Sequence, residues 1–133
     1  MLSADHGKQP VDFTHSHEGF IENKLPFHLM FANKSLIARL NAHDNLLHNT
    51  KRLISRYDWY MTMRHLMTAP YGFVSPESEY YEAIRNFTDS SNTISLLSEK
   101  VPDDRTCEDM VIPNHVCSCK EWVSMTPRQA LDM

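Results

Sequence analysis

Short apolar runs near the start of the chain predict two β-strands separated by a polar loop. Residues 25–31 are strongly apolar and bounded by polar residues, which indicates a buried strand with Pro26 near its start. Residues 1–4 match the end of an earlier strand that stops at residues 5–7, where glycine permits backbone angles that other residues avoid. Residues 8–18 have neither a helical nor an alternating period, so we expect a loop there.

The clearest helical pattern begins at Ser55. Asp58 follows at the spacing of a capping box, so we interpret this carboxylate as a helix cap rather than a catalytic group. Apolar residues then recur at three- and four-residue intervals: Trp59, Met63, Leu66 and Met67. This stripe is expected to face the core until residues 70–72, Pro-Tyr-Gly, end the helix.

The remaining segments are less regular. Residues 36–47 favour a helix, although several Asn and Asp residues weaken the pattern. Residues 75–98 are rich in Ser and Asn and predict a surface excursion that returns to a short strand near residues 94–97. A cysteine-bearing tail opens at residue 101. Because two strands alone are marginal in water, we expect further strands to come from sequence outside this chain or from another chain.

Composition places the chain among ordinary globular proteins. It has 133 residues, 41% hydrophobic and 23% charged, which is one domain's worth of sequence. The net charge is −4 and the Lys and Arg residues are scattered, so we expect no nucleic-acid partner. The longest apolar run, residues 29–32, is far short of the ~20 residues that span a bilayer, so no membrane span is expected.

Three features favour an extracellular or secretory-pathway location. Asn33-Lys34-Ser35 and Asn86-Phe87-Thr88 both match the glycosylation acceptor pattern, and the chain's three cysteines gather between residues 107 and 119. The first residues lack the basic and apolar regions of a signal peptide, so we expect the natural start to lie upstream. The alternative is a cytosolic protein with free thiols and two chance acceptor patterns.

Asp5 and His6 are the first candidate site. A carboxylate and an imidazole supply two ligands for a divalent metal, and ligand sites in α/β sheets lie beyond the carboxyl ends of strands. The competing interpretation of residues 5–7 is a turn in which the Asp5 side chain bonds to nearby backbone.

The other histidines are better explained without a metal. His15 and His17 follow the candidate site; one interpretation is that they complete its coordination shell, but solvated loop histidines are the simpler interpretation. His28 lies in the apolar strand pattern and is expected at the core or sheet edge. His65 lies among Met and Trp residues of the predicted helix, where core packing is expected.

Four blocks of the sequence together resemble one family. Leu2-Ser3-Ala4-Asp5-His6-Gly7 is similar to the Ser-Asp-His-Gly strand end of the alkaline phosphatase superfamily, which includes the sulfatases. Residues 19–27 resemble the Gly-x-x-Glu-x-x-Leu-Pro-Phe step of a sulfatase-like domain-of-unknown-function family of secreted proteins. Residues 53–66 resemble the helix of that family, and residues 95–122 resemble its C-terminal cysteine signature. The resemblance spans residues 2–124.

This resemblance implies an α/β fold: the chain would be a C-terminal fragment of a three-layer α/β/α alkaline-phosphatase-like sandwich, with an irregular cysteine-containing tail. Residues 1–100 would belong to the α/β domain, residues 101–124 to the tail and residues 125–133 to an extension. By the same resemblance, Asp5 and His6 are ligands of a divalent metal, calcium or zinc. The resemblance further implies that Glu22 with residues 25–27 forms the turn into the next strand and that Lys8 is a candidate for contacting the anionic ester substrate.

The resemblance also implies a function. The chain would be a fragment of a metal-dependent sulfatase or phosphatase-like ester hydrolase, inactive alone because the superfamily's nucleophile and first carboxylate ligands lie upstream of these blocks. The alternative is a non-catalytic secreted structural module or a truncated gene product. Cys107, Cys117 and Cys119 match the disulfide tail and not a nucleophile. Cys107 is expected to pair with Cys117 or Cys119, because one intervening residue makes a Cys117–Cys119 bond sterically poor. The leftover thiol would pair with a cysteine outside this chain.

Overall fold

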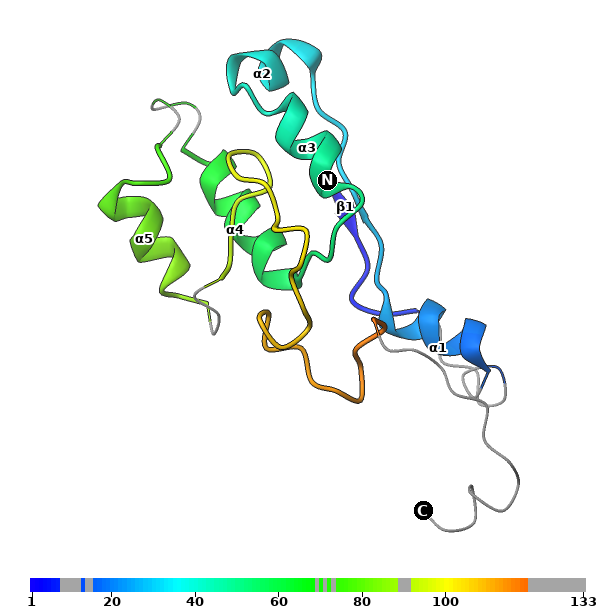
Figure 1. Ribbon diagram of the computed structural model, residues 1–133. Helices are drawn as coiled ribbons and strands as arrows, with labels where there is room; N and C mark the ends of the chain where they lie inside the picture. The colour runs from blue at the N-terminus through cyan, green and yellow to red at the C-terminus, as the bar shows by residue number, and fades with distance from the viewer. Residues whose placement is uncertain are drawn as a thin grey trace, which may run out of the picture.

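The computed structural model describes residues 1–7, 13, 16–68, 70, 72, 74–88 and 92–119. Its elements within these ranges are β1 (Leu2–Ser3), α1 (His17–Lys24), β2 (His28–Leu29), α2 (Lys34–Arg39), α3 (His43–Asn49), α4 (Arg56–Leu66) and α5 (Glu79–Arg85). Figure 1 shows α4 and α5 side by side, with α1 standing apart from both at the far end of the β1 segment. None of the helices in the described ranges is long and apolar enough to cross a bilayer.

The two strands pair antiparallel. Leu2 lies opposite Leu29 and Ser3 opposite His28, and the Ala4 amide extends the ladder by donating to the Phe27 carbonyl at 3.1 Å. Both expected strands therefore exist, but the second covers two residues instead of residues 25–31. The expectation that it is buried was wrong, since its apolar side chains are exposed: Phe27, Leu29 and Phe31.

A short helix, α1, occupies part of the segment expected to be a loop and a turn. The Ser16 hydroxyl caps it by accepting from the Gly19 amide at 3.0 Å. Glu18 in the first turn and Lys24 in the last turn complement the helix dipole. The sequence did not predict it because its residues show almost no apolar period, so capping and end charges specify it instead.

The helix expected over residues 36–47 is two helices. Asn33 caps α2 by accepting from the Ser35 amide at 2.8 Å. The chain then leaves the helical conformation at Asn41, whose φ is 49°. Asparagine tolerates this left-handed conformation better than most residues, which gives the observed break before α3 a local cause.

The capping box of α4 is confirmed, but the expected core-facing stripe holds only for Trp59 and for Leu66, which is partly buried against the core. The Ser55 hydroxyl accepts from the Asp58 amide, and the Asp58 carboxylate accepts from the Ser55 amide at 2.8 Å. Trp59 is buried, whereas Met63 is exposed and Met67 is 69% exposed. The face that α4 buries is instead set largely by Asp58, Met61, Thr62 and His65.

Residues 93–97 and Val101 are buried although they lie in no helix or strand, so the predicted strand near residues 94–97 was wrong. Buried amides need partners, and helix side chains supply them. The bonds are Ile94 N to Asp58 Oδ1 (3.0 Å), Ser95 N to the Tyr81 hydroxyl (2.8 Å), Leu96 N to Thr62 Oγ1 (2.9 Å) and Val101 N to Asn49 Oδ1 (2.8 Å). Polar side chains of α3, α4 and α5 thus replace a strand ladder.

The surface excursion expected over residues 75–98 contains a helix, α5. Ser78 caps it by accepting from the Tyr81 amide at 3.2 Å. Tyr81 and Ile84 are buried and form a hydrophobic cluster with Met61 of α4. Two buried side chains on so short a helix are enough to dock it on α4, but too few to give a helical period in the sequence.

Candidate metal site and groove

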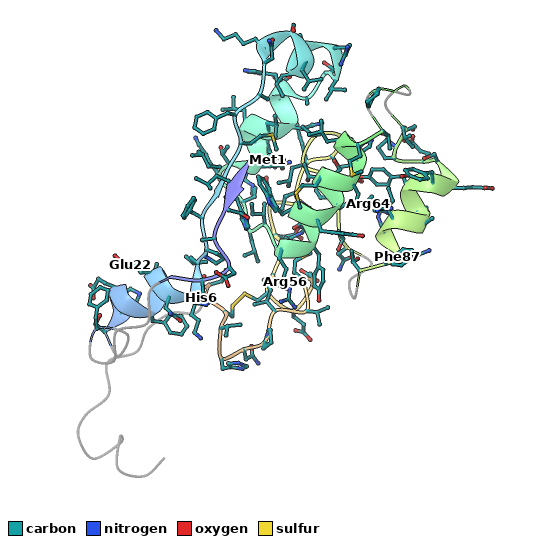
Figure 2. The ribbon with its side chains drawn as sticks, turned by 180° about the vertical axis from the view of Figure 1, so that it is seen from behind. Met1, His6, Glu22, Arg56, Arg64 and Phe87 are labelled. Carbon is teal, nitrogen blue, oxygen red and sulfur yellow. A yellow bond between two sulfur atoms is a disulfide. The ribbon has the colours of Figure 1, made fainter. Side chains whose placement is uncertain are left out.

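Asp5 and His6 follow directly after β1, as the sequence predicted, and Gly7 holds this corner against α1. The Gly7 amide donates to the Asn23 carbonyl at 3.2 Å. A Cβ on residue 7 would lie 2.1 Å from the Glu22 carbonyl oxygen, so a side chain does not fit without moving the backbone. Glycine is therefore needed here for close approach and not for the unusual backbone angle we expected, since Gly7 is not among the described positive-φ residues. Figure 2 shows His6 beside Glu22 at this corner.

The hydrogen bond to Gly7 determines the tautomer of His6. His6 Nδ1 lies 2.7 Å from the Gly7 carbonyl oxygen. A carbonyl only accepts, so Nδ1 carries the hydrogen, and in the neutral ring Nε2 carries the lone pair. Metal-binding histidines are oriented by this kind of bond from the second ring nitrogen to a carbonyl.

The free nitrogen of His6 faces the carboxylate of Asp5. Nε2 and Oδ2 are 3.6 Å apart, and the side chains are 55% and 89% exposed for His6 and Asp5 respectively. The other carboxylate oxygen, Oδ1, accepts from the His6 backbone amide at 3.0 Å, so the turn interpretation also holds. Two lone-pair atoms this close can both act as ligands of one metal ion.

Two ligands do not complete a metal shell. Among the described residues, the one group of three or more His, Cys, Asp or Glu residues close enough to hold an ion is the cysteine group, not this corner. Lys8 and His15 lie outside the described residues. His17 begins α1 and is exposed. A complete shell would need further ligands from water or from groups beyond the described residues.

His28 has a structural role. Its ring stacks on Trp59 with centroids 4.8 Å apart, and burial lowers its pKa. It lies in β2 at the edge of the core, as expected.

An open groove of 1920 Å³ runs along the corner, and its walls include β1, β2, α3, the start of α4 and the tail. Its described lining has an excess of positive charge on a chain that is acidic as a whole. The lining Lys and Arg residues are Lys24, Lys34, Arg52 and Arg56, against the single carboxylate of Asp5. Arg52 is neutralised by Asp103 at 2.6 Å, which leaves three cations to attract an anion.

Sequence reasoning missed these cations because they are spread over residues 24–56 and form no local cluster. Arg56 is the first residue of α4 and is exposed, with its guanidinium 5.1 Å from the centroid of the Tyr57 ring. Only the fold brings it to the same groove as Asp5 and His6.

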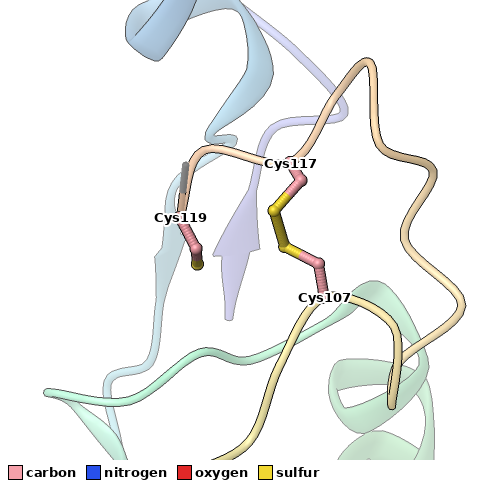
Figure 3. A group of neighbouring side chains, drawn as sticks. All are labelled: Cys107, Cys117 and Cys119. Carbon is pink, nitrogen blue, oxygen red and sulfur yellow. A yellow bond between two sulfur atoms is a disulfide. The ribbon is translucent and has the colours of Figure 1, made fainter. Parts of the chain in front are cut away.

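The predicted pairing of Cys107 with Cys117 or Cys119 is confirmed, whereas a partner for the leftover thiol outside this chain remains a prediction. Cys107 and Cys117 form a disulfide with a Cα–Cα distance of 6.1 Å, and Cys119 is free and exposed. Figure 3 shows the Cys119 side chain next to this bond.

The two predicted glycosylation positions are exposed. Asn33 caps α2, and its side-chain oxygen accepts from the amide and the hydroxyl of Ser35, both at 2.8 Å. Asn86 is the C-cap of α5. Modification of either remains a prediction.

Asp58 has a larger structural role than capping. Its Oδ2 pairs with Arg105 Nη1 at 2.9 Å, and their side chains are 0% and 3% exposed respectively. An ion pair this buried is out of reach of a substrate, which agrees with a non-catalytic carboxylate.

A second buried network joins α4 and α5 to residues 98–99. His65 is buried as expected; its Nε2 lies 2.6 Å from the Val74 carbonyl oxygen, and burial lowers its pKa. The Tyr81 hydroxyl donates to Glu99, and Arg85 pairs with the same carboxylate at 3.2 Å. Burial, then the bond to Glu99, raises the pKa of Tyr81 to about 12. Tyr81 and His65 are fully buried, so we assign the network to folding.

Comparison with known proteins supports one assignment. No curated protein and no solved structure matches the chain. The model of one family, described as "Protein of unknown function (DUF229)", matches residues 1–132. The resemblance to a domain-of-unknown-function family is therefore confirmed at the level of the family. Because the match covers nearly the whole sequence, this chain belongs to the DUF229 family.

Proposed function

We propose that this chain is the C-terminal part of a metal-dependent ester hydrolase of the sulfatase and alkaline-phosphatase kind, and that Asp5 and His6 provide two of its metal ligands. The observation that carries the proposal is the corner after β1. There, a carboxylate oxygen and the lone-pair nitrogen of a histidine lie 3.6 Å apart on the wall of a groove with excess positive charge. That groove suits an anionic ester, either a sulfate or a phosphate.

The donor set fits a divalent metal. A separation of 3.6 Å is within the reach of two ligands that each bind at about 2.1 Å. An imidazole in the set favours zinc over calcium, which prefers oxygen ligands alone. When bound, such a metal supplies polarisation of the ester and stabilisation of the developing negative charge. The chain's own residues orient the ligands, through the Gly7 carbonyl for His6 and the His6 amide for Asp5.

The exposed sheet supports the fragment interpretation. Leu2, Phe27, Leu29 and Phe31 lie on or beside a two-stranded sheet and remain exposed. A sheet this small is marginal on its own, and exposed apolar side chains along it favour a larger sheet in the complete protein. In this proposal, the missing strands carry the nucleophile and the remaining ligands, inside a three-layer sandwich.

The first test is metal binding by the chain itself. We expect calorimetric titration with Zn²⁺ to detect weak binding that the double variant Asp5→Asn/His6→Gln weakens at least about tenfold, or about 1.4 kcal/mol. The matched control is His43→Gln/Asp44→Asn, another adjacent, exposed His–Asp pair, whose Nδ1 and Oδ1 atoms lie 3.2 Å apart. Equal loss in both variants, or no Zn²⁺ binding by the unaltered chain, would count against the proposed ligands.

The second test is activity. The chain alone should hydrolyse neither 4-nitrophenyl sulfate nor 4-nitrophenyl phosphate above background, because two ligands hold a metal weakly and Ser3, the hydroxyl residue nearest the motif in the sequence, precedes it on β1. The complete reading frame should hydrolyse one of them, and Asp5→Ala/His6→Ala should lower that rate by on the order of a hundredfold. An unchanged rate would favour a non-catalytic structural module.

A further inference from the structure

We propose that Cys119 and the Cys107–Cys117 disulfide form a thiol–disulfide exchange centre, in which the bond moves between Cys117 and Cys119 while Cys107 stays bonded. This activity is independent of the proposed hydrolase function. It assigns a role to a thiol that the metal site does not use.

Proximity is the first argument. The sulfur atoms of Cys107, Cys117 and Cys119 all lie within 4.8 Å of one another. Figure 3 shows how the tail leaves Cys107 and turns back, so that Cys117 and Cys119 both end beside it. Exchange requires an attacking thiolate with access to a disulfide sulfur, and here the attacking group is already next to its target.

The three sulfurs also differ in exposure. Cys119 is exposed, whereas Cys107 and Cys117 are 7% and 8% exposed. An exposed thiol is more accessible for reaction than a buried one, so Cys119 is the natural attacking group. External thiols have poorer access to the bond than this internal one.

The exchange step needs no oxidant. The Cys119 thiolate attacks Sγ of Cys107, the Cys107–Cys119 bond forms and the Cys107–Cys117 bond breaks. Cys117 leaves as a thiolate and takes up the proton that Cys119 gave to solvent, so the number of disulfides and thiols is unchanged. Attack on Cys117 would instead join residues separated by one position, which has poor disulfide geometry. Two isomers therefore dominate, with the free thiol on Cys119 or on Cys117.

Chain entropy hardly distinguishes the two isomers. Moving the bond to Cys119 lengthens the closed loop by about two residues, which lowers the closure probability by only about 1.3-fold. The tail near Cys117 is held by short turns, in which the amides of Val116 and Cys117 donate to the Pro113 carbonyl at 3.0 and 3.1 Å. Moving the bond from Cys117 to Cys119 therefore requires only a local shift of this turn. The consequence is that the chain presents its one thiol in one isomer and buries it in the other.

The test uses the full chain, purified and equilibrated in a glutathione redox buffer. Acid quenching protonates thiols and stops exchange, and peptic digestion in acid then allows the disulfide-linked peptides to be mapped by mass spectrometry. We expect peptides joined through Cys107–Cys119 beside those joined through Cys107–Cys117. The variant Cys117→Ser should form the Cys107–Cys119 bond and lose its two free thiols.

Matched variants distinguish exchange from indiscriminate oxidation. Cys119→Ser should contain the Cys107–Cys117 bond alone, and Cys107→Ser should keep two free thiols because Cys117 and Cys119 pair poorly. The wild-type map does not depend on whether a variant folds. The proposal is overturned if wild type contains only Cys107–Cys117, or if Cys119 occurs only as a free thiol or as a mixed disulfide with glutathione or a second chain.

Discussion

Replacing Asp58 with alanine removes the buried carboxylate on which three parts of the chain converge. Its Oδ2 accepts from the Ser55 amide at 2.8 Å and from Arg105 Nη1 at 2.9 Å, and its Oδ1 accepts from the Ile94 amide at 3.0 Å. Both side chains of the ion pair are almost completely buried. The substitution therefore leaves two buried amides without this acceptor and the buried Arg105 guanidinium without its carboxylate partner, while the Asn92 carbonyl still accepts from it.

The magnitude follows from the cost of an uncompensated buried charge. Breaking a buried pair by removing one partner costs about 3–5 kcal/mol, and each buried amide left unsatisfied costs about 1–3 kcal/mol before relaxation. These costs are not additive, because the cavity left by the Asp58 carboxylate admits water to Arg105 and to both amides. We therefore expect Asp58→Ala to lower the free energy of unfolding by about 3–5 kcal/mol, a large part of the roughly 5–15 kcal/mol of a typical domain.

The assay is urea unfolding of the disulfide-intact chain, followed by tryptophan fluorescence, since Trp59 is buried beside this site. Asp58→Asn keeps a hydrogen-bond acceptor and should lose less stability than Asp58→Ala. It can be measured in place of the alanine variant if that variant does not fold. Arg105→Met fills the space without a charge, and we expect the double variant Asp58→Ala/Arg105→Met to be at least about 1 kcal/mol more stable than the sum of the single losses predicts. Additive losses, or a loss below about 1 kcal/mol for Asp58→Ala, would refute this reasoning.

Three further predictions concern other parts of the chain. Because Tyr81 ionises near pH 12 when folded and near 10 when unfolded, the unfolded chain loses its proton first and stability should fall between pH 10 and 12. Tyr81→Phe should remove that part of the pH dependence in alkaline urea titrations, and an unchanged slope would contradict it. Gly7→Ala should displace β1 from α1, because the added Cβ would lie 2.1 Å from the Glu22 carbonyl oxygen, and the amide chemical shifts of both elements should change. Changes confined to the neighbours of residue 7 would argue against this displacement. For protein from a secretory host, glycosidase treatment should lower the mass in two steps, and each of the variants Asn33→Gln and Asn86→Gln should lack one of these steps. No mass change at all would contradict the secretory assignment.

Local spacing determined those features whose partners lie close together in the sequence. The capping box of Ser55 and Asp58 joins residues three apart, so the sequence alone predicted both the bond and the start of α4. The disulfide of Cys107 was predicted for a similar reason, because Cys117 and Cys119 are too close to bond well with each other. The position of Asp5 and His6 after a strand also followed from the local pattern.

Tertiary structure decided which groups meet across long separations. The sequence did not predict that Asp58 and Thr62 bond to the buried amides of residues 94 and 96, because 36 and 34 positions separate the partners. It predicted an apolar face for α4 because apolar period is the usual sign of burial. The buried face also carries the polar side chains of Asp58, Thr62 and His65, because an irregular segment packs there and needs hydrogen-bond partners.

For the candidate site, too, some features were predicted from the sequence and others were decided by the tertiary structure. Sequence alone singled out Asp5 and His6, but only the folded chain provides the Gly7 carbonyl bond that defines the His6 tautomer. Likewise, Arg56 reaches the groove of Asp5 only because β1 and α4 line the same space. Residue types and short spacings specify which groups a site can use, whereas their distances and surrounding charge depend on packing between segments that are far apart in the chain.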